Sequence, residues 1–274
     1  MLIPPVEAVR PTRVPRLPET MRGGILYQAK LDGHRVLAFI DAGAVVLQAR
    51  SGRIVTDRFP EILPALAALA PGTVLDGEVV AWRDTAFDFP ALASTPAARR
   101  RSGAAVSYTA FDLLCAHGID IREKPLAERW PRLLAALEAA PVQVQPIMTT
   151  RERDQAESWL HLLAPVGVEG LVCKALASTY RNTAGTWVKY RTSDTVDAEL
   201  IAALGPEGQV RAARIRLPDG RELTTLALTR AQADLVAGAL AARPTGGPAS
   251  LVEVKVGGGA RHPQVRFVRV RANE

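Results

Sequence analysis

Lys30-Leu31-Asp32-Gly33-His34-Arg35 contains one of only five lysines in a chain of 274 residues. The other 29 basic residues are arginines, which are effectively never deprotonated and so cannot act as nucleophiles. A lysine amine can do so once burial or a neighbouring cation lowers its pKa. A lysine kept at position 30 in an arginine-rich chain therefore indicates amine chemistry. Gly33 beside it fits a backbone that approaches a phosphate closely.

Length and composition indicate a soluble globular chain, long enough for a full core or for two domains of unequal size. Hydrophobic residues make up 48% and charged residues 23%. No apolar run approaches the roughly 18 residues of a membrane-spanning helix. Residues 1–18 lack the apolar core of a secretory signal, and two cysteines in apolar surroundings show no metal-ligand spacing. We therefore expect a cytoplasmic protein without membrane contact.

Residues 25–191 have a pattern of strands with helices between them. Apolar runs predict strands at 25–30, 35–40, 44–48, 73–82, 104–114, 168–174 and 187–190. Amphipathic spacing predicts helices at 60–70, 126–139 and 150–163, the last capped by Thr150.

The pattern changes after residue 191, where 192–194 have the composition of a linker. Strands are then predicted at 196–204, 209–217, 222–227, 251–256 and 265–270, with one helix at 230–242 capped by Thr229. Five short strands and one helix in about 80 residues favour a small barrel, and the OB-fold is the barrel that we expect.

Net charge is +6, which suits a polyanionic partner, although an arginine-rich composition alone can produce it. Residues 254–271 contain five basic residues and no acid, and Arg266-Phe267-Val268-Arg269-Val270-Arg271 alternates basic and apolar positions. Two interpretations remain open for this stretch: a solvated strand face, or a surface that contacts phosphates.

Further short segments follow the lysine motif in a fixed order. They are Arg50-Ser51-Gly52-Arg53, Asp76-Gly77-Glu78, Phe111-Asp112, Glu169-Gly170-Leu171-Val172-Cys173-Lys174 and Trp187-Val188-Lys189-Tyr190-Arg191. The set resembles the covalent nucleotidyltransferases, specifically the ATP-dependent DNA ligases, strongly over residues 27–191 and more weakly beyond. It is most similar to small bacterial ligases related to those of end joining and repair.

The resemblance implies an α+β fold. A nucleotidyltransferase (adenylation) domain with antiparallel sheets and flanking helices would cover residues 1–193, and a small β-barrel OB-fold domain would cover 194–274. Because Lys30 lies near the start, we expect no further DNA-binding domain ahead of it.

The same resemblance implies roles for individual residues. Lys30 would form a lysyl-AMP adduct, Glu78 would bind the ribose, and Glu169 would handle Mg²⁺ or Mn²⁺, for which a carboxylate is a suitable hard ligand. Phe111 would stack on adenine, its alternative being core packing. Asp76 would either hold the local strand or help to place the metal.

Basic residues of the set would act on phosphates. Lys174 and Lys189 would balance phosphate charge, and Arg35 and Arg50 would touch AMP or the 5′-phosphate of a nick, with Arg53 a weaker candidate. A solvated basic face is the alternative for these arginines. Arg191 stands where the family often has lysine, so the charge is kept and the geometry differs.

The chain departs from the family at its end, where the usual Arg-x-Asp-Lys is replaced by Arg271-Ala272-Asn273-Glu274. The resemblance implies that this motif orients pyrophosphate, so we expect a first step that is slower or differently arranged.

These features together predict an ATP-dependent DNA ligase. Lys30 would take AMP from ATP, pass it to a 5′-phosphate in nicked duplex DNA, and the 3′-hydroxyl would then displace AMP. We expect a monomer that works with repair or end-joining proteins. Two alternatives remain: an RNA ligase or mRNA-capping guanylyltransferase, and a catalytically silent nucleic-acid-binding relative.

Overall fold

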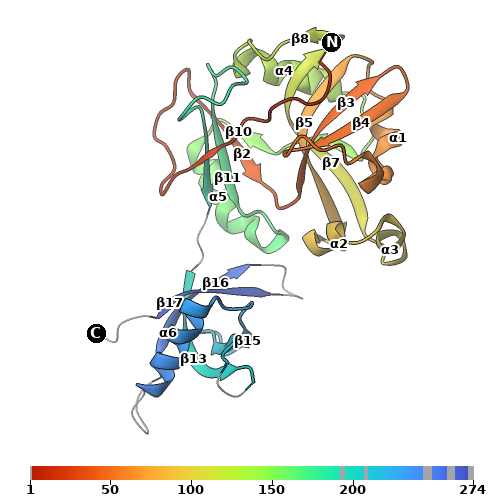
Figure 1. Ribbon diagram of the computed structural model, residues 1–274. Coiled ribbons are helices and arrows are strands. Elements are labelled where there is room, and N and C mark those ends of the chain that lie inside the picture. Colours follow the sequence, from red (N-terminus) through yellow and green to blue (C-terminus); the bar gives the residue numbers. More distant parts are fainter. Residues whose placement is uncertain (1, 192–194, 207–208, 243–248, 258–262, 271–274) are drawn as a thin grey trace. The chain divides into compact units, whose positions relative to one another are not determined.

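The structure is a computed structural model, and it describes residues 2–191, 195–206, 209–242, 249–257 and 263–270. Contacts divide the chain into two compact units, Met1–Thr192 and Ser193–Glu274 (Figure 1). The predicted boundary after residue 193 lies beside this division. That the first unit is an adenylation domain and the second an OB-fold domain stays a prediction.

Two β-sheets lie side by side in the first unit (Figure 1). One has the order β1-β12-β11-β2-β10, comprising Thr12–Arg13, Trp187–Arg191, Gly170–Ala175, Ile25–Lys30 and Thr149–Thr150. The other has the order β4-β3-β5-β7-β8, comprising Ala44–Ala49, His34–Asp41, Thr73–Arg83, Ala105–Ala116 and Ile119–Asp120. Two short strands join the second sheet, β6 (Ala86–Phe87) on β5 and β9 (Val144–Pro146) on β7.

Strand β5 is central to the second sheet because β3 and β7 pair with its two edges. Its burial on both faces explains the apolar residues on either side of the central Asp76-Gly77-Glu78. At Gly77 a Cβ atom would lie only 2.5 Å from the Tyr108 ring, so this position requires glycine. The strand predictions of the first unit are confirmed to within a few residues at each end.

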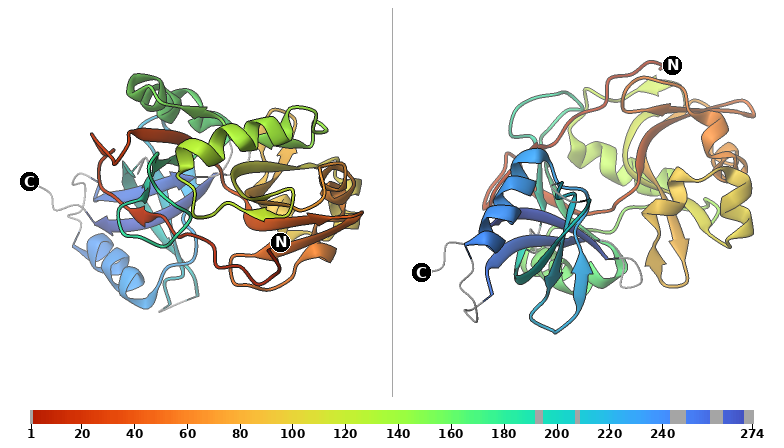
Figure 2. Two further views of the ribbon diagram at one scale, coloured as in Figure 1. Left: turned by 90° about the horizontal axis from the view of Figure 1, so that it is seen from above. Right: turned by 60° about the horizontal axis from the view of Figure 1, so that its bottom comes forward.

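Helices of the first unit differ more from the sequence prediction. The helix predicted at 60–70 is a 3₁₀ turn, Pro60–Ile62, followed by the short α1, Leu63–Ala67. Helix α4 spans Leu126–Leu137 and α5 spans Arg153–Leu162, both on the outside of the unit (Figure 2). Thr150 lies in β10 and does not cap α5, whose N-cap position is Glu152, so that part of the prediction was wrong.

Short helical segments complete the first unit. They are the 3₁₀ turns Thr56–Arg58 and Ala164–Val166 and the helices α2 (Phe89–Ala93) and α3 (Pro96–Arg101).

The described residues of the second unit form a five-stranded antiparallel sheet with one helix against it. Its strand order is β15-β14-β13-β16-β17, comprising Glu222–Thr224, Ala212–Arg216, Thr195–Leu204, Leu251–Gly257 and Gln264–Val270. Helix α6, Arg230–Ala241, begins with a capping box in which the predicted cap Thr229 pairs with Gln232. The two edges of the sheet approach one another, because Thr225 bridges to Val265 and the Leu226 amide donates to the Val265 carbonyl at 2.7 Å.

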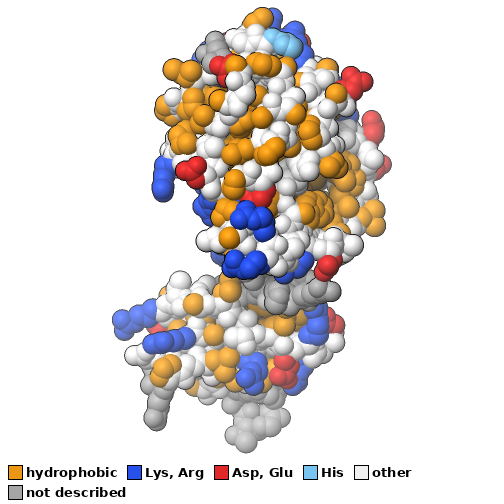
Figure 3. Space-filling view, turned by 90° about the vertical axis from the view of Figure 1, so that its right-hand side faces the viewer, with side chains coloured by type: hydrophobic (Ala, Val, Ile, Leu, Met, Phe, Trp, Pro, Cys, Tyr) orange, Lys and Arg blue, Asp and Glu red, His pale blue; other side chains and the backbone are white. Residues whose placement is uncertain are grey.

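Basic side chains are exposed on both units (Figure 3). Within the described part of the chain, no helix is long and apolar enough to cross a membrane.

Candidate functional site

Lys30 and Glu169 meet where strands β2 and β11 begin to pair. Lys30 ends β2 and Glu169 directly precedes β11, and the Glu169 amide donates to the Lys30 carbonyl at 2.8 Å. The Lys30 Nζ lies 2.6 Å from Glu169 Oε2, with side-chain exposures of 17% and 29%. Two residues that are 139 positions apart therefore form an ion pair that a small molecule can still reach.

Gly33 brings the lysine motif against strand β5. A Cβ atom at this position would lie 2.4 Å from the Val79 carbonyl oxygen and 2.7 Å from Glu78 Cγ. Close packing against the backbone of β5 therefore explains why residue 33 is glycine. The sequence had instead suggested that the glycine lets the backbone approach a phosphate. The packing also places the motif next to Glu78.

Glu78 is a mostly enclosed carboxyl group beside two cations. Burial raises its pKa from the usual value near 4.5 to about 8, although Lys30 and Arg35 act in the opposite direction. The strand register sets Glu78 directly opposite Arg35. A carboxyl group that is partly neutral at pH 7 can either donate or accept a hydrogen bond, which suits contact with a hydroxyl.

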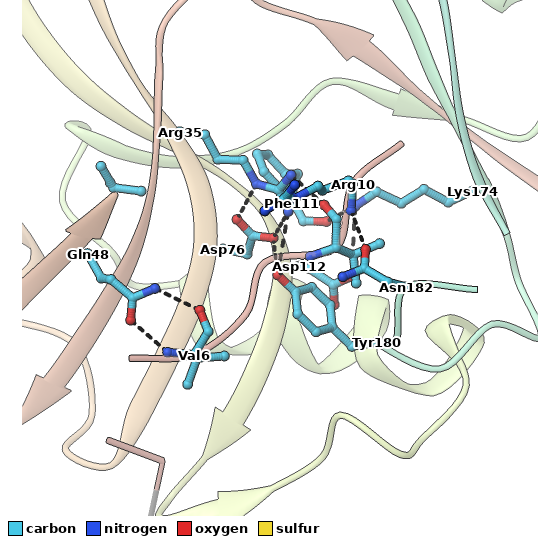
Figure 4. A network of polar contacts seen from close by, with 12 residues as sticks. Val6, Arg10, Arg35, Gln48, Asp76, Phe111, Asp112, Lys174, Tyr180 and Asn182 are labelled. Atoms are coloured by element: carbon cyan, nitrogen blue, oxygen red, sulfur yellow. Dashed lines mark hydrogen bonds and ion pairs between the residues drawn. The ribbon is translucent and has the colours of Figure 1, made fainter. Parts of the chain in front are cut away.

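Arg35 is held entirely by protein groups (Figure 4). Its Nε and Nη2 donate to the two carboxylate oxygens of Asp76 at 3.0 and 2.6 Å, and its Nη1 donates to the Val9 carbonyl at 2.6 Å. Burial alone would lower the pKa of Arg35, but Asp76, Tyr180 and Glu78 together outweigh that effect and leave the pKa raised. In this arrangement the guanidinium links protein segments, and Asp76 occupies its Nε/Nη2 edge.

Asp76 is fully buried, and Tyr180 supplies a third hydrogen bond to it. The Tyr180 hydroxyl donates to Asp76 Oδ2 at 2.6 Å, and burial raises the pKa of Tyr180 so that the hydroxyl keeps its proton. With both oxygens bonded in this way, Asp76 fits the role of holding the local strands, one of the two roles that the sequence left open.

Phe111, Lys174 and Trp187 form a compact group between the sheets. The fully buried Lys174 Nζ donates to the Phe111 carbonyl at 2.7 Å and lies 3.5 Å from the Trp187 ring centroid. Burial lowers the pKa of Lys174 to about 7, while Asp112 acts to raise it. Lys174 is therefore enclosed by protein, whereas the sequence prediction placed it beside the substrate phosphates.

Asp112 and Arg129 form a buried ion pair next to Lys174, whose Nζ lies 3.8 Å from Asp112 Oδ2. Both side chains are fully buried, and the guanidinium spans both carboxylate oxygens at 2.8 and 2.9 Å. Arg129, Tyr180 and Trp187 had no role in the sequence prediction. Trp187 stood inside a quoted motif, but nothing local linked Tyr180 to Asp76 or Arg129 to Asp112.

The remaining predicted residues lie at the edges of this region. Arg50 and Arg53 are exposed in the turn after β4, which a hydrogen bond from the Ala49 amide to the Arg53 carbonyl closes at 2.8 Å. Lys189 is half-buried in β12, opposite Val172. Arg191 ends β12, but its side chain is outside the described part, as is the final segment, residues 271–274.

Metal binding at this site would rely on few protein ligands. Within the described residues no three His, Cys, Asp or Glu side chains are grouped so as to hold an ion. Mg²⁺ usually takes one or two carboxylates together with waters and substrate phosphates. Glu169, partly exposed beside Lys30, fits such a sparse set, whereas the enclosed and fully bonded Asp76 does not.

Sequence comparison assigns the family. A profile described as ATP dependent DNA ligase domain matches residues 5–191. The chain belongs to this family. It is 32% identical over 203 residues to DNA ligase C2 of Mycolicibacterium smegmatis, an alignment that covers 72% of this chain and 56% of that one. It is also 32% identical over 214 residues to the multifunctional non-homologous end joining protein LigD of Pseudomonas aeruginosa, covering 76% of this chain and 25% of that one. The chain thus spans about half the length of the first relative and a quarter of the second.

Solved structures of ligases share the fold. A Lig E DNA ligase superposes with a TM-score of 0.57 at 18% identity, covering 96% of this chain and all of that one. The ligase domain of LigD from M. tuberculosis superposes with a TM-score of 0.56 at 20% identity, covering 96% of this chain and 95% of that one. At these identities the likeness establishes the nucleotidyltransferase-type ligase fold, which mixes helices with a larger share of sheet.

Proposed function

We propose that this member of the ligase family is an ATP-dependent DNA ligase that acts through a lysyl-AMP intermediate. The observation that carries the proposal is the Lys30 amine, partly exposed and 2.6 Å from Glu169 at the centre of the family motifs. The Nζ atom would attack the α-phosphorus of ATP, forming a P–N bond while pyrophosphate leaves. The AMP would then pass to a 5′-phosphate of nicked DNA, and attack by the 3′-hydroxyl would form the phosphodiester and release AMP.

The first step needs the lone pair of the amine, so a proton on Nζ must leave. The Glu169 carboxylate is in position to receive it, since Oε2 is already within hydrogen-bond distance. When Mg²⁺ or Mn²⁺ is bound, it would offset charge on the substrate phosphates, with Glu169 as the protein ligand.

Nucleotide recognition would use groups close to Lys30. Glu78 would bond the ribose hydroxyls, and Phe111 would stack on the base. Lys189, Arg50 and Arg191 would face phosphates, whereas the bonding of Arg35 to Asp76 and Val9 favours a structural role for that residue.

The second unit would be an OB-fold domain that helps to grip duplex DNA, with the first unit as the adenylation domain. Support comes from its five antiparallel strands, whose edge strands approach one another, and from the basic residues of β17. We further expect a monomer that works with end-joining proteins, as the name of the LigD relative suggests for that protein.

The test uses radiolabelled ATP and a nicked duplex, resolved for both labelled protein and sealed DNA. The full chain should form protein–AMP and seal the nick. Lys30→Ala and Lys30→Arg should both fail to form the adduct, because a guanidinium supplies no lone pair at neutral pH. Lys124→Arg is the matched control, since Lys124 is an exposed lysine outside the site.

Two further substrates separate the remaining alternatives. Lys30→Ala should still seal a nick that already carries a 5′-adenylate, because the final step does not use the amine. Labelled GTP and nicked RNA test for capping and RNA-ligase activity. Complete self-adenylation by Lys30→Arg, or labelling by GTP in place of ATP, would refute the proposal.

A further inference from the structure

Lys174 is a buried lysine whose surroundings are aromatic. Its Nζ lies 3.5 Å from the centroid of the Trp187 ring and 4.7 Å from that of Phe111, distances at which a cation is attracted to a ring face. The same atom donates to the Phe111 carbonyl at 2.7 Å and lies 3.8 Å from Asp112 Oδ2. A buried ammonium is costly unless it is bonded, and these contacts meet that requirement.

Lys174 and Trp187 act on Phe111 as a pair. They are direct cross-strand partners on β11 and β12, whereas Phe111 belongs to β7 of the other sheet. The rings of Phe111 and Trp187 meet edge to face, with centroids 6.3 Å apart. The first sheet thus contacts Phe111 at its carbonyl through Lys174 and at its ring through Trp187.

A contact between Lys174 and phosphate does not fit this geometry. The side chain has no exposed surface, and its amine points to the backbone of Phe111. Phe111 itself is only half-buried and can present part of its ring to a ligand.

We propose that Lys174 and Trp187 are positioning residues that fix Phe111 as the base-stacking surface of the nucleotide site. The inference rests on the proposed function, in which Phe111 stacks on the purine of ATP. It assigns both residues to nucleotide affinity and takes Lys174 out of the set that contacts phosphates. Their loss should therefore raise the KM for ATP and leave the rate at saturating ATP nearly unchanged.

A double-mutant cycle tests this assignment. The variants are Lys174→Met, Phe111→Ala and the two combined, and the readouts are KM for ATP and the maximal rate of protein–AMP formation. Lys174→Met should raise KM about three- to tenfold, the size of a lost cation–π contact. Phe111→Ala should raise it about 5- to 150-fold, as expected for a lost base stack. The combined variant should be no worse than Phe111→Ala alone, since Lys174 acts only through Phe111.

Two outcomes would overturn the inference. One is a fall in the maximal rate for Lys174→Met with KM unchanged, which is the signature of a phosphate contact. The other is effects that multiply in the combined variant, which would mean that Lys174 acts independently of Phe111. Absence of protein–AMP in the unaltered chain would instead refute the proposed function, so the two failures are distinguishable.

Trp187 provides a second test should Lys174→Met fail to fold. Trp187→Leu removes the ring face and should raise KM for ATP, while Trp187→Phe keeps an aromatic face and should restore most of the affinity. The Trp187 indole N–H has no hydrogen-bond partner among the described residues, so its removal costs no bond. Trp82→Leu, which removes an indole that packs on Phe87, is the matched control. An unchanged KM in Trp187→Leu would overturn the inference.

Discussion

Glu78 is a residue whose protonation is coupled to folding. With a pKa near 4.5 when unfolded and about 8 when folded, it holds a proton in the native state that the unfolded chain has released. Stability should therefore fall as pH rises between these two values. Glu78→Gln should remove this dependence of stability on pH. Its free energy of unfolding should differ little from that of the parent at pH 4.5 and exceed it by about 4 kcal/mol at pH 8, at about 1.4 kcal/mol for each unit of the pKa difference.

Urea unfolding at several pH values measures this effect. The exposed Glu138, changed to Gln, is the control and should leave the curve unchanged. Parallel curves for Glu78→Gln and the parent would show that burial does not perturb this carboxyl group.

Single residues also mark the limit of what the sequence could predict. The structure brings together Lys30 and Glu169, two residues of the motif set, because one ends a strand and the other precedes the strand that pairs with it. The sequence could not predict where the donors of Arg35 go. Arg35 donates to the carbonyl of Val9, which is 26 residues away in the sequence. It also donates to Asp76, which in turn accepts from Tyr180, a residue 104 positions after Asp76. Burial of this kind comes from tertiary packing, which no local pattern encodes.

At the scale of elements, the N-terminal segment ahead of β2 is held by side chains from several parts of the fold. Gln48 of β4 exchanges two buried hydrogen bonds with the Val6 backbone at 2.8 and 2.7 Å (Figure 4). Arg35 binds the Val9 carbonyl, and the Asn182 side chain accepts from the Arg10 amide at 2.7 Å. Val6, Ala8 and Val9 of this segment therefore belong to the core, although β1 is the only regular element among its described residues.

Gln48→Ala should detach this segment locally and lower the free energy of unfolding. Two buried backbone groups would lose their partners, at a cost of about 1–3 kcal/mol each, less whatever water recovers. Thermal or urea unfolding measures the loss, and the exposed Gln145 changed to Ala is the control. Equal stability of the two variants would mean that the Val6 bonds contribute nothing net.

Elements differ in how far the sequence reveals them. Strands were predictable because their apolar runs are bounded by turn residues, whereas the short helices α2 and α3 were not predicted. Each has a signal in retrospect: Asp88 and Thr95 accept the amides of Ala91 and Ala98 as N-caps, and proline follows within the first turn. With only 5 and 6 residues, they give too few turns for periodicity to be recognised.

At the scale of the whole molecule, the proposed role of the second unit in DNA binding depends on the basic strand β17. The predicted alternation in β17 is confirmed up to Phe267, where Val265 and Phe267 are buried and Arg266 is exposed. Beyond that point Val268 and Arg269 are both exposed, because the register with β16 shifts between Glu253 and Val254. The extra residue is Val268 of β17 itself, so a single bulge in this strand limits what period-two patterning can predict.

Two arginines of β17 differ in their surroundings: Arg269 is paired with a carboxylate, and Arg266 is better suited to bind phosphate. Arg269 lies 2.5 Å from Glu253, so reversing its charge would create repulsion within the unit as well as lose a basic group. Arg266 is exposed and stands opposite Lys255 in the ladder, which makes this part of the sheet basic. A change at Arg266 therefore tests charge with less disturbance of the fold.

Arg266→Glu should weaken binding of the full chain to a nicked duplex and should lower the dependence of affinity on salt. Each lost phosphate contact reduces the slope of log affinity against log salt by about one unit, because fewer counterions are released. Fluorescence anisotropy between 50 and 200 mM salt would measure both quantities, and the melting temperature should stay unchanged since the side chain is exposed. Arg221→Glu is the matched control, because Arg221 is already paired with Asp219 in an exposed turn of the same unit. If Arg266→Glu and Arg221→Glu gave the same affinity and slope, the arginines of β17 would be a solvated face. A selective loss at Arg266 would instead support the phosphate-contacting surface, the second of the two interpretations that the sequence left open.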